Sequence, residues 1–125
     1  MKITDELLTL LGYYLSEGSL YEGNIALYNK KECVLEDMRR CIYAVTGIQP
    51  AERITGGYGT CLELSFTHKV LAEFIKRYCK QKQEKRVPDF IFGLDKRRIG
   101  VFLSALYCGD GYLEQRYFAY YTTSK

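Results

Sequence analysis

LLGYYLSEGSL, at residues 10–20, has a counterpart in LSALYCGDGYL, at residues 103–113. The two stretches align without a gap when the chain is shifted by 93 residues. Self-similarity at a fixed offset indicates a repeated structural unit. Small residues fall on small ones and acids on acids in this alignment: Gly12 on Ala105, Ser16 on Gly109, Glu17 on Asp110 and Gly18 on Gly111.

Helical periodicity surrounds both copies. Leucine and tyrosine recur every three or four residues in the first copy, which predicts a helix that Thr4 or Asp5 caps and Gly18 ends. The same pattern predicts three further helices, which run from Asn29 or Lys30 to Gly47, from Thr67 onward, and from Asp95 to about Cys108.

Two strand pairs are expected between these helices. The first covers residues 20–29 and turns near Glu22-Gly23-Asn24, and the second covers residues 49–67 around Gly56-Gly57-Tyr58-Gly59. Leu62, Leu64 and Phe66 alternate with polar residues, so one face of the sheet is core and the other is polar. The expected fold class is α+β: an αββαββα unit with an antiparallel sheet, followed by the start (αββ) of a second repeat.

Composition and charge narrow the function classes. The chain has 125 residues, 47% of them hydrophobic, which is typical of about one globular domain. It lacks the long apolar run of a membrane span and the basic leader of a secreted protein, and its five widely spaced cysteines fit a reducing, cytoplasmic setting. Residues 68–98 carry ten Lys and Arg against four Asp and Glu, whereas the rest of the chain has a net charge of −3. A basic segment on a nearly neutral body favours an anionic partner, with nucleic acid the first candidate.

The repeated segment also predicts a site. Small residues four positions apart, as in Gly12 and Ser16, let two helix backbones approach closely. If the two repeated helices pack in this way, Glu17 and Asp110 lie side by side at matching ends. Paired carboxylates are costly unless a cation neutralises them, and hard oxygen ligands favour an ion such as Mg²⁺. The alternative is two solvent-exposed acids at helix ends.

Both segments resemble the LAGLIDADG (dodecapeptide, DOD-type) motif of homing endonucleases, with LLGYYLSEG at residues 10–18 and LSALYCGDG at residues 103–111. KRVPDFIF, at residues 85–92, is similar to the linker of archaeal intein endonucleases. The resemblance implies saddle-shaped sheets in the major groove of double-stranded DNA and hydrolysis of both strands with Mg²⁺ (or Mn²⁺). Glu17 and Asp110 would be the catalytic metal ligands, with help from the backbone carbonyls of Ser16 and Gly109. Lys69 would be a basic residue near the scissile phosphate.

Further residues are candidates for DNA contact. A basic run follows the third helix, either as phosphate contacts or as a solvated helix end: Lys80, Lys82, Lys85 and Arg86. The polar strand face offers base-reading candidates, of which Arg53 suits guanine by its chemistry: Tyr21, Asn24, Tyr28, Arg53, Glu63, Ser65, Arg116 and Tyr121.

The second repeat is incomplete. Residues 1–92 make the first repeat with its linker, and residues 93–125 make only the motif helix and hairpin of the second. No splicing-domain signature accompanies them, which indicates an excerpt of an intein-encoded endonuclease or a degenerate remnant. A catalytically inactive DNA-binding remnant and an RNA maturase-like module therefore stay open as alternatives. An unfilled motif-helix face would invite a homodimer.

Overall fold

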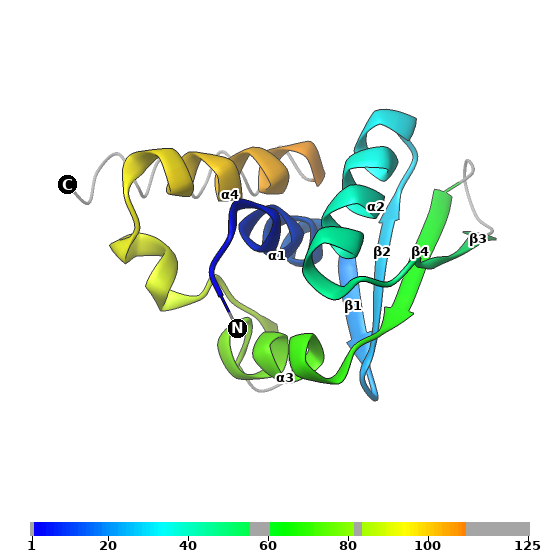
Figure 1. The fold of residues 1–125 in the computed structure, drawn as a ribbon, viewed down its shortest axis with the longest axis horizontal. Coiled ribbons are helices and arrows are strands. Elements are labelled where there is room, and N and C mark those ends of the chain that lie inside the picture. The colour runs from blue at the N-terminus through cyan, green and yellow to red at the C-terminus, as the bar shows by residue number, and fades with distance from the viewer. Residues whose placement is uncertain (1, 56–60, 82–83, 110–125) are drawn as a thin grey trace.

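The computed structural model describes residues 2–55, 61–81 and 84–109 (Figure 1). The elements in chain order are α1 (Asp5–Glu17), β1 (Gly18–Tyr21), β2 (Asn24–Asn29), α2 (Glu32–Thr46), β3 (Ala51–Thr55), β4 (Cys61–Thr67), α3 (Lys69–Tyr78), β5 (Lys80–Gln81), β6 (Glu84–Lys85), the 3₁₀ helix η1 (Asp89–Gly93) and α4 (Lys96–Gly109). The α+β class and the order αββαββα are thus confirmed.

The larger sheet is antiparallel, with the strand order β1-β2-β4-β3. Its first hairpin turns at Glu22 and Gly23, whose φ angles are 49° and 83°. A two-residue turn with two positive φ angles matches the twist of a hairpin, and glycine adopts such an angle at no steric cost. Counting outward from the turn pairs Gly18 with Leu27. The predicted position of the first turn is therefore confirmed.

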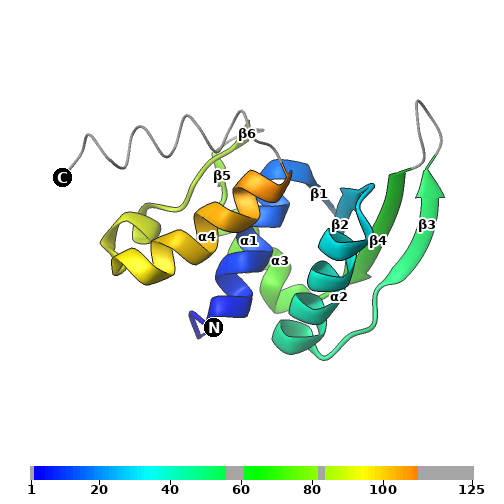
Figure 2. The ribbon, with the colours of Figure 1, turned by 90° about the horizontal axis from the view of Figure 1, so that it is seen from above.

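The helices cover one face of this sheet (Figure 2). Ile25 and Leu27 of β2 and Leu64 of β4 are buried in one core with α1, α2 and α4. α1 lies between α2 and α4, and its Tyr13 hydroxyl donates a 2.6 Å hydrogen bond to the Asp37 carboxylate of α2. Burial, and then the Asp37 carboxylate, raises the pKa of the Tyr13 phenol. In both views, no described element lies on the other face of the sheet.

Two predicted helix caps are confirmed. The Thr4 hydroxyl accepts a hydrogen bond from the amide of Leu7, at 3.1 Å, and the Asp95 carboxylate accepts one from the amide of Arg98, at 2.8 Å. Both side chains satisfy amides that the first helical turn leaves without a partner.

Two predicted helix starts are wrong by one to three residues. His68, not Thr67, caps α3, because its Nδ1 accepts the hydrogen bond from the amide of Leu71 at 3.1 Å. α2 begins at Glu32, because the Asn29 side chain accepts a hydrogen bond from the amide of Lys31 at 2.9 Å. That bond closes a turn ahead of the helix.

The basic run after α3 is not a helix end. Tyr78 is the last residue of α3, and β5 and β6 then form a short antiparallel pair. The amide of Arg86 donates a 2.8 Å hydrogen bond to the carbonyl of Cys79, and Val87 is buried in the core. These two contacts bring the chain back to the core. A continued α3 would carry the chain away from it.

Some predictions fall outside the described residues. They are the turn at residues 56–60, the strands expected after residue 110, and the side chains of Lys82, Asp110, Arg116 and Tyr121. Along the part of the chain that the structure describes, no helix is both long and apolar enough to cross a membrane.

The five free cysteines allow a test of this packing. Cys41 and Cys79 are fully buried, and burial raises the pKa of each thiol to about 12, so both stay protonated at neutral pH. We expect maleimide to modify the exposed Cys33 and Cys108 rapidly in the native protein, and Cys41 and Cys79 only after denaturation. Mass spectrometry of peptides from native and urea-treated samples measures this order. Equal labelling of all five thiols in the native state would contradict the fold.

Candidate functional site

α1 and α4 are in close backbone contact at Gly12. A Cβ added to Gly12 would lie 2.7 Å from the carbonyl oxygen of Phe102 and 2.8 Å from the Cβ of Ala105. The residues that the sequence repeat aligns, Gly12 and Ala105, therefore face each other across the helix seam. Ser16 lies one turn further along α1, where its hydroxyl donates a 3.2 Å hydrogen bond to the carbonyl of Tyr13. Gly109 is the last residue of α4.

The carboxyl ends of α1 and α4 lie side by side (Figures 1 and 2) and open on one hollow of about 570 Å³. The hollow lies where β2 ends and β4 begins. Its lining residues come from both of these helices, both strands, the loop before α2 and the first turn of α2: Glu17, Asn29, Lys30, Lys31, Cys33, Val34, Cys61, Tyr107 and Cys108. Glu17, the last residue of α1, is the one carboxylate among these described residues.

Sequence reasoning missed Asn29, Lys30 and Lys31 as members of this site. The register of the first hairpin brings them there: because Gly18 pairs with Leu27, the residue before Gly18 lies beside the end of β2. A carboxylate, an amide and two ammonium groups around one hollow can bind a hard cation and a phosphate together. The signal was present in the sequence, since counting outward from the Glu22-Gly23 turn reaches these residues.

The outward face of the sheet collects the candidate base-reading residues. Residues paired directly across neighbouring strands share a face, so the registers place six candidates together: Tyr21, Asn24, Tyr28, Arg53, Glu63 and Ser65. Tyr21 is 75% exposed, and the amide of Asn24 donates a 3.2 Å hydrogen bond to the hydroxyl of Thr67. The face is polar along its length and lies opposite the helices.

Comparison with solved structures supports the architecture. The chain is similar to the homing endonuclease I-DmoI, as seen in its mesophilic variants and in its complex with DNA and Ca, with TM-scores of 0.53 and 0.52 and 18% sequence identity. These similarities cover 84% and 85% of this chain. The chain has the LAGLIDADG homing endonuclease fold. It spans 60% and 57% of the length of those two I-DmoI chains.

A protein that is similar in sequence is described as an RNA polymerase subunit and not as a homing endonuclease. The DNA-directed RNA polymerase subunit Rpo1C from Methanocaldococcus jannaschii is 24% identical over 102 residues, which are 81% of this chain and 12% of that protein. No family model matches the sequence. The structural similarity therefore establishes the homing endonuclease fold.

Within this homing endonuclease fold, Lys69 does not lie at the Glu17 hollow. Cys61, at the start of β4, lines the hollow, whereas Lys69 begins α3, two residues after the end of the same strand. A seven-residue strand is about 20 Å long, so the two ends of β4 are too far apart for Lys69 and Glu17 to share one phosphate. The structure therefore does not bring Lys69 to the Glu17 hollow, because the strand carries it away.

The structure describes the basic run only in part. The backbone of Lys80 is in β5, and Lys82 lies outside the described residues. The Lys85 ammonium lies 5.2 Å from the centre of the Tyr14 ring on α1, a cation–π contact. Arg86 forms an ion pair with Asp89 at 3.7 Å. The Lys85 contact places β6 against the motif helix α1, three residues before Glu17.

The homodimer through the motif helices finds no support. Every residue of α1 from Leu7 to Leu15 is buried, with α2 and α4 of the same chain packed on it. The face that the sequence left unfilled is covered by α4, so α1 has no comparable face for a second copy.

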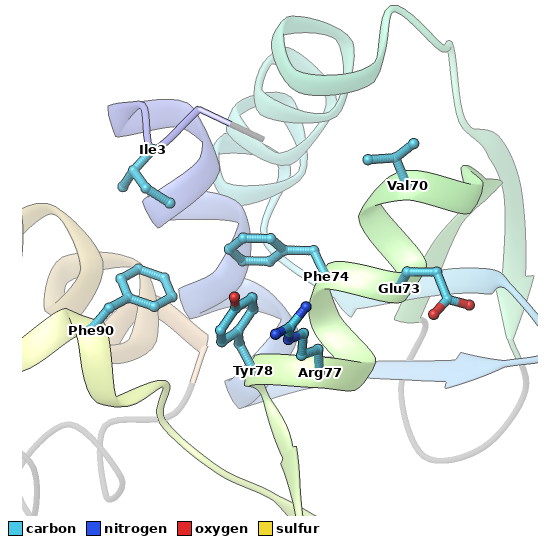
Figure 3. A pocket seen from close by; sticks show the side chains of 7 residues that line it. All are labelled: Ile3, Val70, Glu73, Phe74, Arg77, Tyr78 and Phe90. Atoms are coloured by element: carbon cyan, nitrogen blue, oxygen red, sulfur yellow. The ribbon is translucent and has the colours of Figure 1, made fainter.

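A second hollow, also of about 570 Å³, lies between α3, η1 and the residues before α1 (Figure 3). Phe74, Tyr78 and Phe90 turn toward one another there, with ring centres 4.8–5.9 Å apart. The Arg77 guanidinium lies 5.4 Å from the centre of the Tyr78 ring. None of the predicted site residues lines this hollow, so the Glu17 hollow and the outward sheet face form the candidate site.

Proposed function

We propose that this chain is the first repeat, with the start of the second, of a site-specific endonuclease that hydrolyses both strands of DNA. The observation that carries this proposal is the convergence of the two motif-helix ends on the hollow that contains Glu17, Lys30 and Lys31. The fold similarity to I-DmoI, whose solved structures include complexes with DNA and Mn or Ca, adds support.

The residues at the hollow fit a divalent cation. Within the described residues no cluster of three or more His, Cys, Asp and Glu side chains could hold a metal ion. Mg²⁺ needs no such cluster, because it is commonly bound by one or two carboxylates together with water and substrate phosphate. In this proposal Glu17 provides one carboxylate and Asp110 the other, with the backbone carbonyls of Ser16 and Gly109 nearby. When bound, Mg²⁺ or Mn²⁺ would polarise the scissile phosphate and favour its attack by water.

The remaining residues position DNA. Lys30 and Lys31 are exposed at the hollow, where their ammonium groups would hold a phosphate against Glu17. The outward sheet face would lie in the major groove, whose width admits a β-ribbon. Lys85 and Arg86 would contact the phosphate backbone, which positions DNA without reading its sequence.

We also propose an intein origin. The similarity to an RNA polymerase subunit covers only 12% of that protein, as expected when an endonuclease is inserted in an unrelated host protein. Sequencing the reading frame on both sides of this chain tests it. Splicing-domain motifs flanking the endonuclease would support the origin, whereas an uninterrupted polymerase sequence would contradict it.

A library of duplexes with a randomised core tests the proposed function. We expect the chain to select a sequence by gel shift in Ca²⁺ and to cut the selected duplex in Mg²⁺ or Mn²⁺, with no cutting after chelation by EDTA. Selective binding without cutting in either metal would favour an inactive DNA-binding remnant. Preference for folded intron RNA over duplex DNA would favour the maturase-like alternative.

The two lysines at the hollow should matter more than Lys69. We expect the double substitution Lys30→Gln, Lys31→Gln to lower the cleavage rate by about 100-fold, equivalent to about 2.7 kcal/mol of transition-state stabilisation. Lys69→Gln is the matched control and should leave the rate within about threefold of wild type, because Lys69 lies at the other end of β4. Single-turnover cleavage of the selected duplex measures both. Equal losses in the two variants would contradict the placement of the site.

A further inference from the structure

Tyr28, Glu63 and Arg53 form one row across the outward face of the sheet. Glu63 of β4 pairs with Tyr28 of β2 on one side and with Arg53 of β3 on the other. Residues directly opposite each other on neighbouring strands have Cβ atoms only about 5 Å apart. The central carboxylate is therefore enclosed by its two neighbours, and its side chain is only 12% exposed.

A carboxylate is out of place on this face if the face meets DNA. Its negative charge would repel phosphates, and enclosing a charge without a partner is costly. Arg53 removes both objections, because its Nη2 lies 3.2 Å from one oxygen of Glu63 and 3.3 Å from the other. The Arg53 side chain itself is 73% exposed, so Glu63 holds one terminal nitrogen of the guanidinium while the rest of the group faces outward.

The geometry leaves Arg53 able to read a base. Within the described residues, the Glu63 contacts engage one guanidinium nitrogen, Nη2. Guanine presents O6 and N7 side by side in the major groove, and an arginine recognises them with two parallel N–H donors. The planar guanidinium must be aimed for this contact, and a fixed carboxylate beside it restricts its rotation.

We propose that Glu63 is a positioning residue that aims Arg53 at a single guanine of the target, which rests on the proposed function of the sheet in DNA binding. Arg53 touches the base, and Glu63 acts only through Arg53. Preference for guanine at one position therefore depends on both members of the pair.

Three variants of the full chain, each selected against the randomised duplex library in Ca²⁺, test this proposal. Arg53→Gln identifies the position, because it should lose a guanine preference of about 5- to 150-fold there and nowhere else. Glu63→Gln should lower the preference at the same position by at least about fivefold. Glu52→Gln is the matched control: Glu52 is the neighbour of Arg53 in β3, but its ion pair with Arg39 of α2 lies on the helix side of the sheet. It should keep every preference.

The Glu63→Gln result separates positioning from simple charge. Removing a negative charge from a DNA-binding face should tighten binding to all sequences, whereas loss of positioning lowers the preference for one guanine. Adding Glu63→Gln to Arg53→Gln should cost nothing more at that position, because coupled residues are not additive. Thermal melting checks that the double variant is folded, so that its selection result can be compared with that of Arg53→Gln alone.

Two results would overturn the proposal. If Glu63→Gln keeps the guanine preference that Arg53→Gln loses, or if Glu63→Gln and Glu52→Gln flatten all positions alike, Glu63 does not position Arg53. In both cases the wild-type selection still stands, and with it the proposed function. If the wild-type chain enriches no sequence at all, both proposals fail.

Discussion

Replacing Gly12 with valine is expected to lower the free energy of unfolding by about 3 kcal/mol, the upper end of the usual cost of overpacking a core. The reason is the contact between α1 and α4. A Cβ at Gly12 would lie 2.7 Å from a backbone oxygen and 2.8 Å from the Cβ of Ala105, and neither of these atoms can rotate away. The helices would have to separate, which opens the core on both sides of α1. Urea denaturation followed by circular dichroism measures the loss.

Gly100→Ala is the matched control, because Gly100 is also in one of these two helices. Outside its own helix backbone, no atom of the described residues lies within 4 Å of the place where its Cβ would be. Alanine favours a helix over glycine by about 1 kcal/mol, so this variant should be more stable than wild type. A Gly12→Val variant that unfolds at the wild-type urea concentration would show that the helices do not meet at Gly12.

Much of this arrangement could be predicted because its causes are local. Leucines at helical spacing define the buried face of α1, and the alternation of Leu62, Leu64 and Phe66 with polar residues defines the two faces of β4. The Glu22-Gly23 turn sets the register of the first hairpin. The contact between α1 and α4 could also be predicted, because the repeat aligns two small residues that could face each other. The structure brings these residues, Gly12 and Ala105, into contact.

The residues that prediction missed depend on tertiary placement. Lys30 and Lys31 look like an ordinary basic loop, and only the return of β2 beside the end of α1 makes them part of the Glu17 hollow. Lys69 lies away from this hollow for the converse reason. It follows a strand whose first residue is at the site, and the length of that strand separates the two.

The ion pair of Arg53 and Glu63 shows a further limit. Sequence alternation places both residues on the polar face and makes each a candidate for reading a base. Only the β3–β4 register shows that the two residues pair directly. Glu63 is largely enclosed and contacts Arg53, whereas Arg53 stays exposed. A list of polar residues on one face therefore overstates the number that can touch DNA.

Glu17→Gln is expected to lower the cleavage rate by at least about 1,000-fold, which corresponds to about 4 kcal/mol of transition-state stabilisation. Glutamine keeps the size of the side chain and removes its charge, so a divalent cation at the hollow loses an anionic ligand. The fold should be unaffected, because Glu17 is the last residue of α1 and is only partly buried. Single-turnover cleavage of the selected duplex in Mg²⁺ measures the rate, and thermal melting checks the fold.

Binding must be measured beside cleavage, because the two readouts separate catalysis from positioning. In EDTA, where no free divalent cation is present, Glu17→Gln should bind the selected duplex at least as tightly as wild type, since it removes a negative charge next to a phosphate. Glu36→Gln, an exposed position on α2 with the same change of charge, should cut like wild type. If Glu17→Gln cuts at the wild-type rate, Glu17 holds no catalytic cation. If Glu17→Gln also loses binding in EDTA, Glu17 contacts and positions DNA directly, in addition to any role in binding a cation.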